Sequence, residues 1–162
     1  MSSIEEKKKN RILFLKKLYE ISKGSRYTII RMDAIGKELG FEYSVTSDTA
    51  EYLEKEGLIK WQGIGGELSL THRGIKIIEA QDSGLLAEKE KNRKLFLTKL
   101  YEKTDGSQTA MIKMDAVGEE LGFDYKTTSD VVEYLIGEGL VKPVALGGFI
   151  SITHWGVKMI ED

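Results

Sequence analysis

The chain has 162 residues, with 24 lysines and arginines against 26 aspartates and glutamates, and a formal net charge of −2. The absence of cysteine excludes disulfides, thiolate zinc sites and thiol nucleophiles, and the lack of excess positive charge restricts any nucleic-acid contact to a local patch. We expect a cytoplasmic protein without a membrane partner, since the charged N-terminus lacks a signal-peptide core and no apolar run would span a bilayer.

The chain contains one sequence twice. Residues 10–80 align with residues 92–162 without a gap, and about 40 of the 71 aligned positions are identical. A repeat of this length is a whole domain rather than a solenoid unit. We therefore predict two domains, residues 1–82 and residues 83–162, that carry two similar surfaces.

The first copy begins with a predicted helix over residues 5–22, followed by a short strand over residues 27–32. A second helix starts near Asp33, and a third closes at Gly57. Apolar residues at helical spacing mark the helices, and β-branched residues mark the strand. Thr46, Ala50 and Leu53 are expected to form the buried stripe of the third helix.

Two short β runs then surround a glycine-rich turn at residues 63–66, which predicts a hairpin. Thr71 is expected to cap a final helix over residues 72–79. About four residues, 81–84, separate the copies. The predicted order is helix, strand, helix, helix, hairpin, helix, repeated once, in a mainly α member of the α+β class.

Three segments of each copy resemble the winged helix-turn-helix superfamily. They are residues 35–40, 53–59 and 70–74, repeated as residues 117–122, 135–141 and 152–156. In DNA-binding members of this superfamily the third helix enters the major groove, and the hairpin, or wing, contacts the backbone or the minor groove. The resemblance implies a DNA-binding or transcription-regulator-like protein whose two tandem domains act as a pseudo-dimer on double-stranded DNA.

Candidate nucleic-acid contacts follow from this resemblance by position. On the third helices they are Ser44, Ser47 and Tyr52 in the first copy, and Lys126, Thr127, Ser129 and Tyr134 in the second. The expected groove-facing side also includes Asp48, Glu51, Asp130 and Glu133. Residues 42–57 contain five acidic residues and one lysine, and residues 124–139 contain four acidic residues and one lysine. Because phosphates repel such a helix, a protein-interaction or adaptor module that does not bind DNA stays open as the alternative function.

Positive charge lies at the start of each copy instead. Residues 1–23 contain seven basic and three acidic residues. Lys7, Lys8, Lys9 and Arg11 are the candidates for phosphate contacts. Two interpretations stay open: a solvated helix face with internal charge pairs, or a surface that meets phosphates or the acidic third helix of another copy.

The second copy has a more apolar hairpin than the first. Gln62, Glu67 and Arg73 are replaced by Val144, Phe149 and Trp155. An exposed apolar group of this kind needs a cover. The candidate interface residues are Val144, Leu146, Phe149, Trp155 and Ile136. They either pack within the chain or form a homodimer seam or a docking site for a protein partner.

No catalytic, metal or cofactor site is predicted. His72 and His154 occupy equivalent helix starts with no second metal-ligating residue nearby in the sequence, so we expect a structural role for both. The turn at residues 63–66 lacks the spacing and the lysine of a phosphate-binding loop. No nucleophile–base or paired-carboxylate arrangement is readable, and we expect a protein that is not an enzyme.

Overall fold

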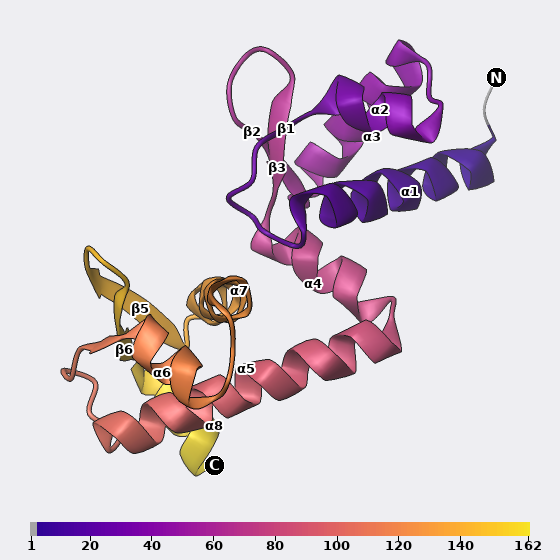
Figure 1. Cartoon of the computed structure of the whole chain (residues 1–162). Helices are drawn as coiled ribbons and strands as arrows, with labels where there is room; N and C mark the ends of the chain where they lie inside the picture. Colours follow the sequence, from indigo (N-terminus) through magenta and orange to yellow (C-terminus); the bar gives the residue numbers. More distant parts are fainter. Residues whose placement is uncertain (1–2) are drawn as a thin grey trace. The chain divides into compact units, whose positions relative to one another are not determined.

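The computed structural model describes residues 3–162 and divides into two compact units, Met1–Ser83 (unit 1) and Gly84–Asp162 (unit 2). The elements of unit 1 are α1 (Ile4–Ser22), β1 (Ile30–Arg31), α2 (Met32–Leu39), α3 (Tyr43–Lys55), β2 (Ile59–Trp61), β3 (Glu67–Leu70) and α4 (His72–Ala80). The elements that follow are α5 (Ser83–Thr104), β4 (Ile112–Lys113), α6 (Met114–Glu120), α7 (Tyr125–Gly137), β5 (Val141–Ala145), β6 (Phe149–Ile152) and α8 (His154–Glu161). Figure 1 shows the same order of helices and strands in both units, which is the predicted mainly helical α+β class.

Each unit holds one small antiparallel sheet beside its helices. The strand order is β1-β3-β2 in unit 1 and β4-β6-β5 in unit 2. The hairpin strand β3 pairs with β2 through Trp61 opposite Leu68, and β6 pairs with β5 through Pro143 opposite Ile150. The register of the second hairpin shifts between Pro143 and Ala145. The two hairpins therefore share a topology but differ in local backbone.

The core of each unit lies where the first helix, the third helix and the sheet meet. In unit 1 the fully buried residues include Phe14, Leu18, Ile35, Ala50 and Leu68. Burying one such large apolar side chain contributes roughly 1.5–3 kcal/mol. In unit 2 the corresponding core includes Phe96, Leu100, Val117, Val132 and Ile150. The predicted stripe of Thr46, Ala50 and Leu53 is confirmed as buried.

Glycine allows the second and third helices to approach closely. A Cβ at Gly36 would lie within 2.2 Å of the Thr46 hydroxyl, and one at Gly118 would lie within 2.1 Å of the Thr128 hydroxyl. Only a residue without a side chain fits this contact. The α2–α3 pair and the α6–α7 pair consequently have the same geometry, and this geometry determines where the third helix sits.

Two predicted boundaries are wrong. The predicted strand over residues 27–32 is confined to Ile30 and Arg31, because Met32 already begins α2 and only these two residues pair with β3. Residues 81–84 were expected to form a link, but α5 begins at Ser83, about two and a half turns before Asn92, the counterpart of Asn10. Thr71 caps α4 as predicted, accepting a hydrogen bond from the Gly74 amide at 3.1 Å.

Candidate functional site

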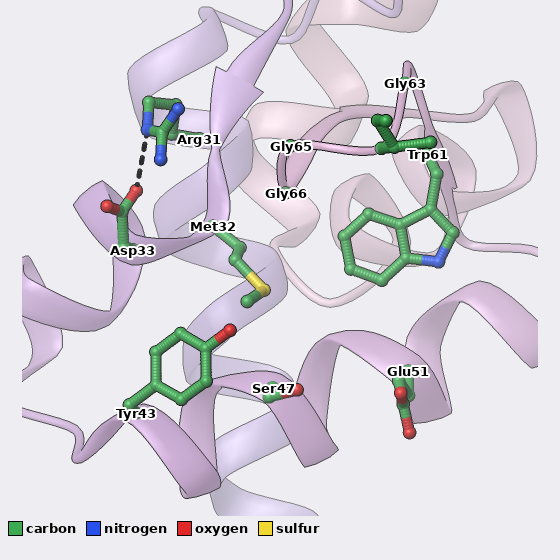
Figure 2. Close-up of a pocket in the computed structure, with 11 residues that line it drawn as sticks. Arg31, Met32, Asp33, Tyr43, Ser47, Glu51, Trp61, Gly63, Gly65 and Gly66 are labelled. Atoms are coloured by element: carbon green, nitrogen blue, oxygen red, sulfur yellow. Dashed lines mark hydrogen bonds and ion pairs between the residues drawn. The ribbon is translucent and has the colours of Figure 1, made fainter.

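A recess of unit 1 lies between α3 and the β2–β3 hairpin. Tyr43, Ser47 and Glu51 line its helical side. These residues are four apart in sequence, so they form one stripe along the helix. Trp61 and Ile64 line the hairpin side, and the cleft has a volume of about 610 Å³. Figure 2 shows Trp61 on the hairpin opposite Tyr43, Ser47 and Glu51 of α3. The cleft therefore lies between the third helix and the hairpin of unit 1.

An internal ion pair stands at one edge of the cleft. The Arg31 Nε donates to the Asp33 Oδ1 at 3.1 Å, drawn as the dashed line in Figure 2. The hydrogen bond from Arg31 lowers the pKa of the Asp33 carboxyl below its usual range. Met32, between them in sequence, is buried. The charges of Arg31 and Asp33 largely cancel, so the guanidinium is already committed to a partner of its own chain.

A second side of α3 faces α1. The Arg11 guanidinium carbon lies 3.4 Å from the centroid of the Tyr52 ring, which is a cation–π contact. Beside it, Lys7, Arg11 and Asp48 line a recess of about 260 Å³. The Asp48 carboxylate therefore lies in a region where bases of α1 offset its charge.

Unit 2 repeats this α1-side arrangement. The Arg93 guanidinium carbon lies 3.3 Å from the centroid of the Tyr134 ring, and Arg93 is only 8% exposed. A recess of about 240 Å³ is lined by Lys89, Arg93 and Asp130 among others. Asp130 also accepts from the Lys126 ammonium at 2.6 Å. The arginine–tyrosine contact is thus part of the packing of both first helices.

Which side of the third helices faces a ligand stays a prediction, and the structure adds the neighbours of each expected residue. In unit 1 the structure places Ser47 and Glu51 on the hairpin side but Asp48 and Tyr52 on the α1 side. Ser44, Ser47, Asp48 and Glu51 are spaced three and four residues apart, so they form one exposed or half-buried face whose two edges meet the hairpin and α1. In unit 2, Tyr134 likewise lies under the α5 arginine.

The remaining nucleic-acid candidates are scattered. Lys7, Lys8, Lys9 and Ser44 are exposed, whereas Ser129 is half-buried. Lys8 lies 4.0 Å from Glu5, and Thr127 lines the recess beside Arg93. The Thr127 amide donates to the Asp124 carboxylate at 2.8 Å, the cap of α7. Lys126 is the only basic residue among the nucleic-acid candidates on the third helices, and it forms an ion pair with Asp130.

The predicted interface residues of unit 2 differ in accessibility. Leu146, at the hairpin loop, is 96% exposed, and Trp155 on α8 is 61% exposed. Val144 and Phe149 are half-buried, and Ile136 packs against the core of unit 2. The Trp155 ring meets the His154 ring edge-on at 5.2 Å. Leu146 and Trp155 are therefore the members of this set with most apolar surface in water.

Tyr43 and Arg31 are among the cleft residues that were missed as binding candidates. Tyr43 carries a detectable signal, because it precedes Ser47 by four residues and Glu51 by eight. Arg31 carries none, because its approach to the cleft depends on the pairing of β1 with β3. Trp61 is a half-buried hairpin residue and also forms a wall of the cleft.

Comparison with known proteins leaves the chemistry of these residues as the guide to function. No protein-family model, curated protein or solved structure matches the chain. Across residues 3–162, no group of three or more histidine, aspartate or glutamate side chains is arranged to hold a metal ion. Within the same range, no helix has the length and apolarity needed to cross a bilayer.

Proposed function

We propose that the chain is a protein-interaction module made of two winged-helix units, with the cleft between α3 and the β2–β3 hairpin as its principal partner-binding surface. The observation that carries this proposal is the lining of the cleft. It combines the aromatic side chains of Tyr43 and Trp61, a fully exposed Ile64 and the carboxylate of Glu51. Aromatic and aliphatic anchors of this kind supply most of the energy in protein–protein contacts.

The hairpin loops support a protein partner rather than a phosphate backbone. Ile64 and Leu146 occupy equivalent positions, and both are almost completely exposed. The loop segments 63–66 and 145–148 contain no lysine or arginine. Covering one such side chain with a partner would contribute roughly 1.5–3 kcal/mol, whereas neither side chain can attract a phosphate.

The charges on the cleft favour a cationic partner. Glu51 makes no hydrogen bond or ion pair with the described residues 3–162, and the nearby Arg31 is held by Asp33. At 4 Å, a carboxylate and a phosphate repel each other by roughly 4 kcal/mol at an effective dielectric constant of 20. The same geometry attracts a lysine or arginine. The occupant we propose is therefore a segment of a partner protein that carries both apolar and basic side chains.

Duplex DNA is the second candidate, and one observation favours it. Lys7 lines a recess together with Val45 and Asp48 of α3, so the start of α1 lies beside the third helix. Lys8 and Lys9 are exposed on the same turns of α1. These ammonium groups would contact the DNA backbone if the third helix approached a groove. The carboxylate of Glu51 opposes that approach.

The test is selection of peptides on the full chain. A phage-displayed library of random peptides is expected to enrich sequences that combine leucine or aromatic residues with lysine or arginine. The best selected peptide, labelled with fluorescein, is then titrated by anisotropy. Ile64→Asp is expected to weaken its binding by at least tenfold, because the exposed anchor becomes a charge. Lys8→Glu, on α1, is the matched charge-changing control and is expected to leave peptide affinity unchanged.

The same protein sample is titrated with a 30-base-pair duplex at 50 mM and 200 mM salt. The proposal expects no binding at either concentration. Duplex binding that falls steeply with salt and is weakened by Lys7→Glu, together with no enriched peptide, would replace the proposal with the DNA-binding function. Light scattering separates a third outcome. If the chain is a dimer, and Leu146→Asp makes it monomeric without affecting peptide binding, the second hairpin is a self-association surface.

A further inference from the structure

Two aromatic side chains reach into the cleft of unit 1 from different elements. Figure 2 shows Trp61 extending from the hairpin toward α3, and Tyr43 extending from α3 beside Met32. Tyr43 is 70% exposed although it lines the cleft, so much of its ring is open to a ligand. An exposed indole or phenol ring presents a negative face that attracts a cation.

The other aromatic rings near bases in this protein already have a cation from their own chain. Arg11 lies over Tyr52, Arg26 over Tyr27 and Arg93 over Tyr134. Within residues 3–162, no arginine or lysine lies over the ring of Trp61 or Tyr43. The rings of the cleft are thus open to a cation from outside.

Glu51 supplies a negative charge to the same cleft. Figure 2 shows it on α3, one turn beyond Ser47 and below Trp61. Because Arg31 and Asp33 are paired with each other, the net formal charge of the three groups is −1. Aromatic faces with an adjacent carboxylate are the chemistry that binds ammonium and guanidinium groups.

Unit 2 differs at this site in one decisive residue. Pro143 occupies the position of Trp61, so the indole is absent, while Tyr125 is retained at the position of Tyr43. A base of unit 2 also interacts with its own hairpin. The Lys113 ammonium lies 5.6 Å from the centroid of the Phe149 ring. Unit 2 therefore lacks the aromatic wall that unit 1 offers.

We infer that the cleft of unit 1 holds one lysine or arginine side chain of the partner, with its cationic group against Trp61 and Tyr43 and its charge balanced by Glu51. This inference rests on the protein-interaction function proposed above and adds its specificity. Unit 2 does not hold such a side chain. The two units then bind different parts of a partner, a basic residue at unit 1 and an apolar residue at the Leu146 loop.

The experiment uses the full chain and the fluorescein-labelled selected peptide, with each lysine or arginine replaced in turn by norleucine. One of these replacements is expected to weaken binding by about tenfold, which is the effect of losing one cation–π and charge contact. Trp61→Pro introduces the residue of unit 2. This variant and Glu51→Gln are each expected to weaken binding of the unsubstituted peptide. Neither variant is expected to weaken binding of the peptide in which norleucine replaces the critical lysine or arginine.

Tyr43→Ala and Tyr125→Ala provide a matched pair, because the two tyrosines are 70% and 69% exposed at equivalent positions. Only Tyr43→Ala is expected to reduce affinity. Circular dichroism and the unfolding midpoint of each variant confirm that it folds. In a Trp155→Phe background, Trp61 is the only tryptophan, and its fluorescence is expected to change on addition of Ac-Ala-Leu-Arg-Leu-Ala-NH2.

Peptide binding that is insensitive to every norleucine replacement and to Trp61→Pro would overturn this inference while leaving the protein-interaction function in place. A preference for Ac-Ala-Leu-Glu-Leu-Ala-NH2 over the arginine peptide would overturn it as well, since Arg31 would then be the binding group. If the library enriches no peptide and neither pentapeptide binds, the proposed function and this inference both fail.

Discussion

The two units share their scaffold contacts and differ on their hairpins. Tyr19 donates to the Glu79 carboxylate at 2.9 Å, and Tyr101 donates to the Glu161 carboxylate at 2.6 Å. The hydrogen bond and charge of Glu161 raise the pKa of the Tyr101 phenol. These contacts join the first and last helices of a unit. Their recurrence in both units identifies them as requirements of the fold.

The hairpins of the two units, in contrast, differ in sequence. Between residues 61 and 64 the first copy has no identity with the second, although the flanking Lys60 and Gly65 are retained. The hairpin residues that differ include the wall of the unit 1 cleft and the exposed apolar tip of each loop. A duplicated domain can therefore change its binding surface without changing its packing. The predictions below test this separation between scaffold and hairpin.

The largest effect is expected from Gly74→Ala in unit 1 and Gly156→Ala in unit 2. A Cβ at Gly74 would lie 2.2 Å from the Leu58 carbonyl oxygen, and one at Gly156 would lie 2.3 Å from the Leu140 carbonyl oxygen. Because the opposing atom belongs to the backbone, the helix has to shift. We expect each substitution to reduce the free energy of unfolding of its own unit by about 3 kcal/mol.

Urea unfolding followed by tryptophan fluorescence measures each unit separately. Trp61 reports on unit 1 in a Trp155→Phe background, and Trp155 reports on unit 2 in a Trp61→Phe background. Gly40→Ala is the control, because its added Cβ meets nothing within 4 Å and only its φ of +72° is unfavourable. It is expected to cost about 1 kcal/mol. Equal costs for Gly40→Ala and Gly74→Ala would show that the close approach is unimportant.

The helices and their caps were largely predictable from the sequence, because they depend on interactions between residues that are close along the chain. Helical periodicity identified the buried Thr46, Ala50 and Leu53, and a threonine followed by a short helix identified the Thr71 cap. The C-terminal end of α2 at Gly40 follows from the left-handed backbone that glycine adopts there. Each of these features depends on interactions within a few residues.

The site was less predictable because it depends on which elements meet. The sequence places Asp48 and Tyr52 on one side of α3 with Ser47 and Glu51, but it does not predict that α1 puts Arg11 over Tyr52 while Ser47 and Glu51 line the cleft. The pairing of β1 with β3 brings Arg31 to the same cleft. The local hydrophobic pattern does not show which distant helices pack together or which distant strands pair. Only the structure shows these contacts.

A second, smaller effect compares the arginines of the first helices, Arg11 on α1 and Arg93 on α5. Arg93 is buried and Arg11 is half-buried, although each lies over an equivalent tyrosine. We expect Arg93→Ala to cost about 2 kcal/mol and Arg11→Ala to cost less than about 1 kcal/mol, since cation–π contacts strengthen as water is removed. The same two-tryptophan urea assay measures both. An equal cost at the two positions would mean that burial of the guanidinium does not matter.

The smallest effect concerns the caps of the third helices, where the units differ by one methylene. The Asp124 carboxylate accepts from the Thr127 amide at 2.8 Å and caps α7, whereas the Glu42 side chain makes no cap for α3. Glu42→Asp is therefore expected to stabilise unit 1 slightly, and Asp124→Glu to destabilise unit 2.

The pH dependence of the stability difference between wild type and Asp124→Glu tests whether the helix cap causes that difference. The hydrogen bonds from Thr127 lower the pKa of the Asp124 carboxyl in the folded state. The cap therefore stabilises unit 2 fully above the ordinary aspartate pKa near 4, and this contribution is lost as the pH falls further. The difference between wild type and Asp124→Glu is accordingly expected at pH 7 and should shrink below about pH 4. If the two proteins still differ in stability at pH 2.5, the packing of the longer glutamate side chain, and not its charge, causes the difference.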